Sequence, residues 1–139
     1  MAPTIAAIMQ GIETRLETIA GLRVSSYVAD QINPPQAFVG VPEIPDYHTT
    51  MRRARITIEP TVTVLVSGAL DRVGQMKLAE FANPDGAQSV VAAIEGDRTL
   101  GGTVDDCIVT SFRPLGLEEV GLIGYYGGVF ALRVAARGV

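Results

Sequence analysis

The chain has 139 residues, 47% of them apolar and 19% charged, and its 11 Lys and Arg against 15 Asp and Glu give a formal net charge of −4. This composition excludes a chain that is disordered throughout, and the length predicts a single domain over residues 1–139. The negative charge argues against a general nucleic-acid binder, and one Cys with one His exclude an intramolecular disulfide and a Cys/His zinc site.

Apolar residues near the N-terminus recur at the spacing of a helix. The residues at steps of three and four are Ile5, Ile8, Ile12, Leu16 and Ile19. Residues 4–20 are therefore predicted to form a helix with one apolar face, which Thr4 is placed to cap and Gly21 is placed to end.

Short extended segments follow this helix. Residues 22–28 and 36–41 are predicted to be strands, and a proline pair breaks the chain between them. Pro42 and Pro45 then make residues 41–55 a long connection or a hairpin excursion, and connections of that length are often functional.

The clearest strand signal is the alternation of residues over 56–66. Five apolar residues from Ile56 to Val66 share one face, and Glu59 lies with several threonines on the other. Pro60 cannot donate to a hydrogen-bond ladder, so we predict an edge strand or a bulge at this point. An edge strand would be open to pairing with another chain.

The middle of the chain predicts a pair of helices. Residues 69–82 form the first, with Phe81 among its inward-facing residues. Asp85 followed by Gln88 resembles a capping box, so a second, shorter helix is predicted over 86–95.

Strand character returns in the last third of the chain. The predicted strands are 103–113, 118–125 and 128–136, and Gly127–Gly128 is predicted to be the tight turn of a terminal hairpin. The order of elements predicts an α+β fold. Its sheet is mostly antiparallel, and the N-terminal helix and the central helix pair pack on it.

Few residues here suit catalysis or metal binding. His48 lies in a polar loop segment, and Cys107 lies in a predicted strand, where we expect a buried packing residue. The acidic pairs Asp105–Asp106 and Glu118–Glu119 are predicted to be solvated, with an oxygen-ligand metal site as the alternative. We therefore expect no enzyme, cofactor or metal site. We also expect no membrane segment, because the longest uncharged apolar stretch has 12 residues where a spanning helix needs about 20.

The sequence has one basic cluster, formed by Arg52, Arg53 and Arg55. Three guanidinium groups so close together can meet a partner's carboxylates or phosphates, or they can remain in solvent. No aromatic residues are interleaved with them, which argues against stacking on single-stranded nucleic acid. We predict a protein interface here, and its candidate residues are Tyr47, His48, Arg52, Arg53, Arg55, Glu59 and Pro60.

The order of these segments resembles a known family. The helix at 4–20 is followed by a proline-bearing loop and the basic run Met51-Arg-Arg-Ala-Arg, which leads into the strand Ile56-Thr-Ile-Glu-Pro-Thr-Val-Thr-Val-Leu-Val. After the helix pair the chain closes with Gly-Tyr-Tyr-Gly-Gly-Val-Phe-Ala-Leu-Arg-Val. Over nearly its whole length this arrangement resembles the tail terminator (tail completion) proteins of long-tailed siphophages, especially those that infect actinobacteria.

The resemblance implies a structural role in the virion. Such proteins form a ring, usually hexameric, on the head-proximal end of the tail tube, where they stop tube polymerisation and join the tail to the head. The implied partners are other copies of the chain, the tail tube protein and the head connector protein. DNA passes through the lumen without sequence-specific binding, and the ring is assembled in the host cytoplasm. The alternatives are a head–tail connector or stopper, a tail tube subunit, or a small ligand-binding α+β domain.

Overall fold

The computed structural model describes residues 4–19, 21–25, 35–47, 55–67, 72–120 and 123–137. Within these ranges, side chains are not described at positions 46, 55, 67, 72–75, 115–120, 123–126 and 137. The elements in chain order are α1 (Ile5–Leu16), β1 (Arg23–Ser25), β2 (Gln36–Val39), β3 (Glu43–Asp46), β4 (Arg55–Glu59), β5 (Thr61–Ser67), α2 (Arg72–Ala82), α3 (Val90–Glu95), β6 (Asp106–Val120) and β7 (Ile123–Arg137). The chain has an α+β fold, as predicted.

The sheet is built around β7. This strand pairs antiparallel with β4 and β5 on one side and with β6 on the other. On the far side of β4 and β5, β3 pairs antiparallel with β4 and β2 pairs antiparallel with β5. Among the described strands, only β1 and β2 pair in parallel. The sheet is thus mostly antiparallel, as predicted.

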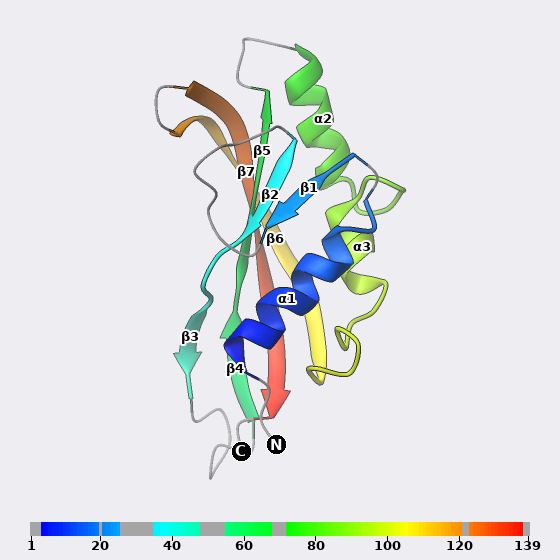
Figure 1. Ribbon diagram of the computed structural model, residues 1–139, viewed down its shortest axis with the longest axis vertical. Coiled ribbons are helices and arrows are strands. Elements are labelled where there is room, and N and C mark those ends of the chain that lie inside the picture. Colours follow the sequence, from blue (N-terminus) through cyan, green and yellow to red (C-terminus); the bar gives the residue numbers. More distant parts are fainter. Residues whose placement is uncertain are drawn as a thin grey trace.

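The helices cover one face of the sheet. Figure 1 shows α1, α2 and α3 on the same side, and α1 contacts β2, α2 contacts β5 and β7, and α3 contacts β6. The main core lies between these layers and includes Ile8, Ile12, Leu16, Val62, Val64, Phe81, Ile94, Phe130, Leu132 and Val134. No described helix is long and apolar enough to cross a membrane.

Helix α1 begins as predicted and ends earlier than predicted. The Thr4 hydroxyl oxygen accepts a hydrogen bond from the Ala7 amide at 3.0 Å. The helix stops at Leu16 because the following amides bond back over three residues in a tighter turn, such as Ile19 N to Leu16 O at 3.0 Å. Ile19 stays buried through this turn, which explains why the apolar periodicity continues past the helix. Gly21, with a φ of +81°, follows the turn.

The central helix pair is present, but its second helix starts from a different cap. Ser89 has extended backbone angles, and its Oγ accepts from the Ala92 amide at 3.1 Å, so α3 begins at Val90. The capping box predicted at Asp85 is wrong, because that carboxylate accepts from the adjacent Gly86 amide. Phe81 is fully buried at the end of α2, as predicted.

The predicted turn at Gly127–Gly128 is wrong, because both glycines lie inside β7. The predicted strands 103–113 and 118–125 are largely one strand, β6, which pairs with β7 as far as Val120 opposite Ile123. Residues 121–122 lie outside the described residues. Glycine is needed at both positions for a different reason: side chains of neighbouring strands lie close to the backbone there. A Cβ on Gly127 would lie 2.6 Å from Leu65 Cδ2, and one on Gly128 would lie 2.6 Å from Phe112 Cζ.

Candidate interaction surface

The structure describes only part of the predicted interface. His48, Arg52 and Arg53 lie outside the described residues, and Arg55 contributes only the described backbone at the start of β4. Tyr47 directly follows β3 and is 53% exposed. Glu59 and Pro60 lie at the junction of β4 and β5, where the surface described below is formed.

Pro60 is not on an edge strand, so that prediction is wrong. The pairs Ile58–Val134 and Thr61–Ala131 share one register, and β4 and β5 therefore form one continuous neighbour of β7. The Leu132 amide donates to the Pro60 carbonyl at 3.0 Å, which places this proline inside the sheet.

The predicted alternative, a bulge at Pro60, is also wrong, because β4 and β5 keep one register with β7 through this residue. The irregularity lies instead on the neighbouring strands β2 and β3. Val39 is opposite Val62 and Glu43 is opposite Glu59. Three residues, 40–42, lie between Val39 and Glu43, whereas only two, 60–61, lie between Glu59 and Val62. This irregularity sits beside Pro60, where the sheet has no N–H to donate.

The face of the sheet that points away from the helices is polar around this junction; we call it the outer face. Residues alternate between the two faces along a strand, so Glu59 and Thr61 lie on the outer face while Ile58 and Val62 are buried in the core. Further along the sheet, Phe38 and Leu65 are buried outside the main core.

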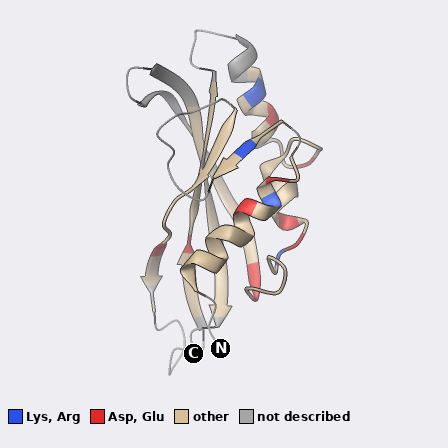
Figure 2. Ribbon diagram, viewed as in Figure 1, with Lys and Arg blue, Asp and Glu red and all other residues tan. Residues whose placement is uncertain are grey.

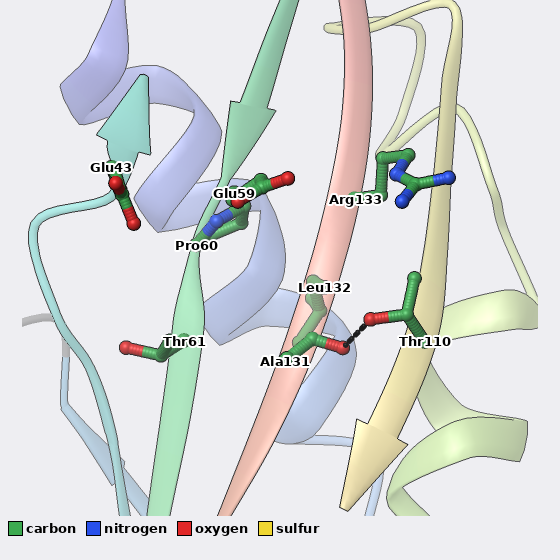
Figure 3. Close-up of a pocket in the computed structure, with 8 residues that line it drawn as sticks. All are labelled: Glu43, Glu59, Pro60, Thr61, Thr110, Ala131, Leu132 and Arg133. Carbon is green, nitrogen blue, oxygen red and sulfur yellow. Dashed lines mark hydrogen bonds between the residues drawn. The ribbon is translucent and has the colours of Figure 1, made fainter. Parts of the chain in front are cut away.

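A shallow hollow of about 230 Å³ lies on the outer face (Figure 3). Residues from β3, β4, β5, β6 and β7 and from the Pro60 junction line it, and they are Glu43, Glu59, Pro60, Thr61, Thr110, Ala131, Leu132 and Arg133. Thr110 is fixed at one side, because its hydroxyl donates to the Ala131 carbonyl at 3.0 Å. The hollow thus gathers side chains from segments that are distant in the sequence.

Acidic side chains lie on one side of this hollow. Glu43 on β3 is directly opposite Glu59 on β4. Figure 2 shows acidic colouring on both of these neighbouring strands. Like charges directly opposite each other destabilise a sheet unless a cation lies between them. Because Ile58 is opposite Val134 and the register continues without a shift to Thr61 and Ala131, Glu59 is opposite Arg133.

Basic side chains lie on the other side. In Figure 3 the Arg133 side chain extends over β6 and away from Glu59. Arg113 on β6 is opposite Val129, so it shares the outer face with Arg133. Both arginines are exposed. The outer face therefore has an acidic half, Glu43 and Glu59, and a basic half, Arg113 and Arg133.

The ion pairs among the described side chains leave these two halves uncompensated. They join Lys77 to Glu80 at 3.9 Å and Arg98 to Asp106 at 2.6 Å. No described side chain forms an ion pair with any of the four outer-face residues, so their charges remain available to a partner.

The free side of β6 is covered at several points. The Cys107 amide donates to Asp106 Oδ1 at 3.0 Å, and the Val109 amide donates to Glu95 Oε2 at 3.2 Å. Pro114, further along the strand, has no N–H at all. These features are typical of edge strands that are protected against pairing with another chain.

The outer side of β3 is protected in a similar way. In the described sheet this strand pairs only with β4, and its chain neighbourhood contains Pro42 and Pro45. Neither proline can donate to an added strand. Any contact made at these two edges must therefore rely mainly on side chains.

Cys107 is a buried packing residue, as predicted. Desolvation in the core, together with the nearby Asp106 and Glu95 carboxylates, raises the pKa of its thiol to about 12. A thiol with this pKa is not a nucleophile near neutral pH, because the reactive form is the thiolate.

Two acidic residues elsewhere, Asp97 and Asp106, are engaged within the chain. Both oxygens of Asp106 accept from Arg98, at 2.7 and 2.6 Å, and this hydrogen bonding lowers the pKa of Asp106. Asp97 accepts from Thr99 and from the Gly101 amide, which lowers its pKa. In the described part of the chain, no three His, Cys, Asp or Glu side chains come together as a metal-binding group. The Glu118–Glu119 side chains lie outside the described residues.

Comparison with models of known protein families and with curated proteins finds no match to this chain.

Sequence reasoning found Glu59 and Pro60 but missed Glu43, Arg113 and Arg133. Alternation along the last strand does separate Arg133 from the apolar residues on either side of it. That pattern predicts which face of the sheet Arg133 lies on, but not which residues lie beside it. The hollow appears only when β3, β4, β7 and β6 are placed in order across the sheet.

Proposed function

We propose that this chain is a structural virion protein, a tail terminator that caps the head-proximal end of a phage tail tube as a ring, usually hexameric. The ring ends tail polymerisation and joins the tail to the head. It acts by offering surfaces to other copies, to the tail tube protein and to the head connector, and it catalyses no reaction. DNA passes through its lumen, and the ring is assembled in the host cytoplasm.

One observation carries the proposal in addition to the resemblance in sequence. All three described helices cover one face of the sheet, and the opposite face is polar around the junction of β4 and β5, where it carries separate acidic and basic halves. A ring of identical subunits needs two different, complementary surfaces on each copy. A sheet whose outer face carries unlike charges at its two sides supports such an assembly.

The test is electron microscopy of the purified chain mixed with polymerising tail tubes. We expect rings at one end of each tube, and tubes whose growth stops in the presence of the chain. Tubes grown without it continue to lengthen and serve as the control. Incorporation of the chain along the tube would instead indicate a tube subunit, and binding only to completed heads would indicate a connector or stopper. A chain that leaves tube growth and tube ends unchanged is not a terminator.

A further inference from the structure

We propose that copies of this chain meet along the two charged sides of the outer face, with the acidic half of one copy against the basic half of the next. The acidic half is Glu43 with Glu59, and the basic half is Arg113 with Arg133. This inference rests on the proposed function, because it names the contact that closes the ring.

The two halves lie toward opposite sides of the sheet. The strands run in the order β3, β4, β7 and β6 across this region, with the acids on the first two and the arginines on the last two. When two sheets lie side by side, the β3 side of one copy meets the β6 side of the next. Acidic and basic halves then meet at every junction, which is a head-to-tail contact that can close into a ring.

Within the described part of one copy, the charges of both halves are not compensated by ion pairs. Glu43 and Glu59 are directly opposite each other, and the ion pairs of the described side chains are made elsewhere. Glu59 and Arg133 are neighbours in register, yet Arg133 extends toward β6. A guanidinium group from a second copy would supply the counter-charge that these carboxylates lack among the described side chains.

The protected edges determine what kind of contact this is. The outward amides of Cys107 and Val109 already donate to carboxylates, and Pro42, Pro45 and Pro114 offer no donor. A continuous backbone ladder between copies is therefore blocked along these stretches. Side-chain charge remains as the means of selecting the neighbour, and it favours unlike halves over like ones.

Charge reversal tests this arrangement. An acid-reversed variant carries Glu43→Lys and Glu59→Lys, and a base-reversed variant carries Arg113→Glu and Arg133→Glu. We expect each variant alone to lose assembly, measured by sedimentation velocity and electron microscopy. We expect an equimolar mixture to regain it, because copies with two basic halves can alternate with copies with two acidic halves around an even-numbered ring.

A matched control separates the contact from general charge effects. Glu17→Lys with Glu80→Lys reverses two exposed acids on the helical side, and this variant is expected to assemble like the wild type. Circular dichroism melting checks that all variants are folded. An acid-reversed variant that assembles as the wild type does, or folded variants whose mixture stays unassembled, overturns the inference.

A milder pair serves if the reversed variants do not fold. Glu43→Gln with Glu59→Gln removes the charge and keeps the shape of the side chains. Assembly of the wild type is expected to weaken between about 0.1 M and 1 M salt, where the Debye length falls from about 10 Å to about 3 Å. The neutral variant is expected to lose most of that salt dependence, and an unchanged salt dependence overturns the inference.

These outcomes are independent of the tube-capping result. A chain that caps tubes but assembles regardless of the four charges retains the proposed function and loses this contact. A chain that assembles through the four charges but leaves tube ends bare retains the contact and loses the proposed function.

Discussion

The ring of Phe112 on β6 lies over Gly128 on β7, so closely that a Cβ at position 128 would be 2.6 Å from Phe112 Cζ. Phe112 also packs against Phe130, with ring centroids 4.7 Å apart. The glycine therefore makes room for an aromatic pair that closes the core beside the β6–β7 hairpin. This use of glycine has no connection with a turn.

Replacing this glycine should destabilise the fold. Gly128→Ala forces the Phe112 ring to move, and overpacking of this kind costs about 1–3 kcal/mol of unfolding free energy. Gly40→Ala is the matched control, because its added Cβ would meet only Thr61 Oγ1 at an ordinary 3.7 Å. Urea unfolding of the two variants measures the difference. Equal stability for both would show that Phe112 does not occupy the space above position 128.

A second prediction concerns the junction of α1 and α3. Arg15 Nε donates to the Ala93 carbonyl at 2.9 Å, which satisfies one of the last carbonyls of α3. Arg15→Met keeps the length of the side chain and removes this donor. A hydrogen bond to a charged group contributes about 1.5–3 kcal/mol, so we expect a loss of that size in denaturant unfolding.

Gly96 provides the test of that geometry. A Cβ at this position would collide with the Arg15 guanidinium group. Gly96→Ala is therefore expected to destabilise the wild type and to cost much less in the Arg15→Met background. Additive losses in this double-mutant cycle would mean that the two residues do not touch.

The Cys107 thiol predicts how stability changes at high pH. Its pKa is raised from the model-peptide value of 9.0 to about 12 by burial and nearby carboxylates. The folded state therefore holds the proton more tightly than the unfolded state. The resulting stabilisation is fully present below pH 9.0 and is lost as the pH rises toward 12.

Cys107→Ala isolates this contribution. We expect the unfolding free energy of the wild type to fall more steeply above pH 9.0 than that of the alanine variant. A thiol reagent at neutral pH should modify the wild type only after unfolding. Rapid modification of the native chain would contradict the burial of this side chain.

How far the sequence predicts this molecule depends on whether a pattern has one physical meaning. The helical spacing of Ile8, Ile12 and Leu16 has one, and all three are buried in the core. A glycine can indicate either a backbone with positive φ or the close approach of a neighbouring group. The sequence predicts a turn at Gly127–Gly128, whereas the structure shows neighbouring side chains close to both glycines. A proline in a strand also has two meanings, because it removes a hydrogen-bond donor at the edge of a sheet or inside it. Pro60 lies inside the sheet.

The outer face required information that no local pattern contains. Glu59 is recognisable as a polar position in a strand, but its neighbours Glu43 and Arg133 are 16 and 74 positions away in the chain. Only the register of β3, β4 and β7 brings them into one row. Strand alternation predicts the face of a residue, whereas long-range pairing decides its partners.

The packing of α1 within a single copy can be tested at Leu16. This side chain is fully buried in the core of one chain, so Leu16→Ala should cost about 2–5 kcal/mol through lost contacts and a cavity. The neighbouring Glu17→Ala removes an exposed side chain and serves as the control. Thermal melts should be run on monomeric protein. A large loss there means that α1 completes its own subunit's core, whereas a shift of less than about one degree, against several degrees expected for this loss, would mean that the helix packs only when copies assemble.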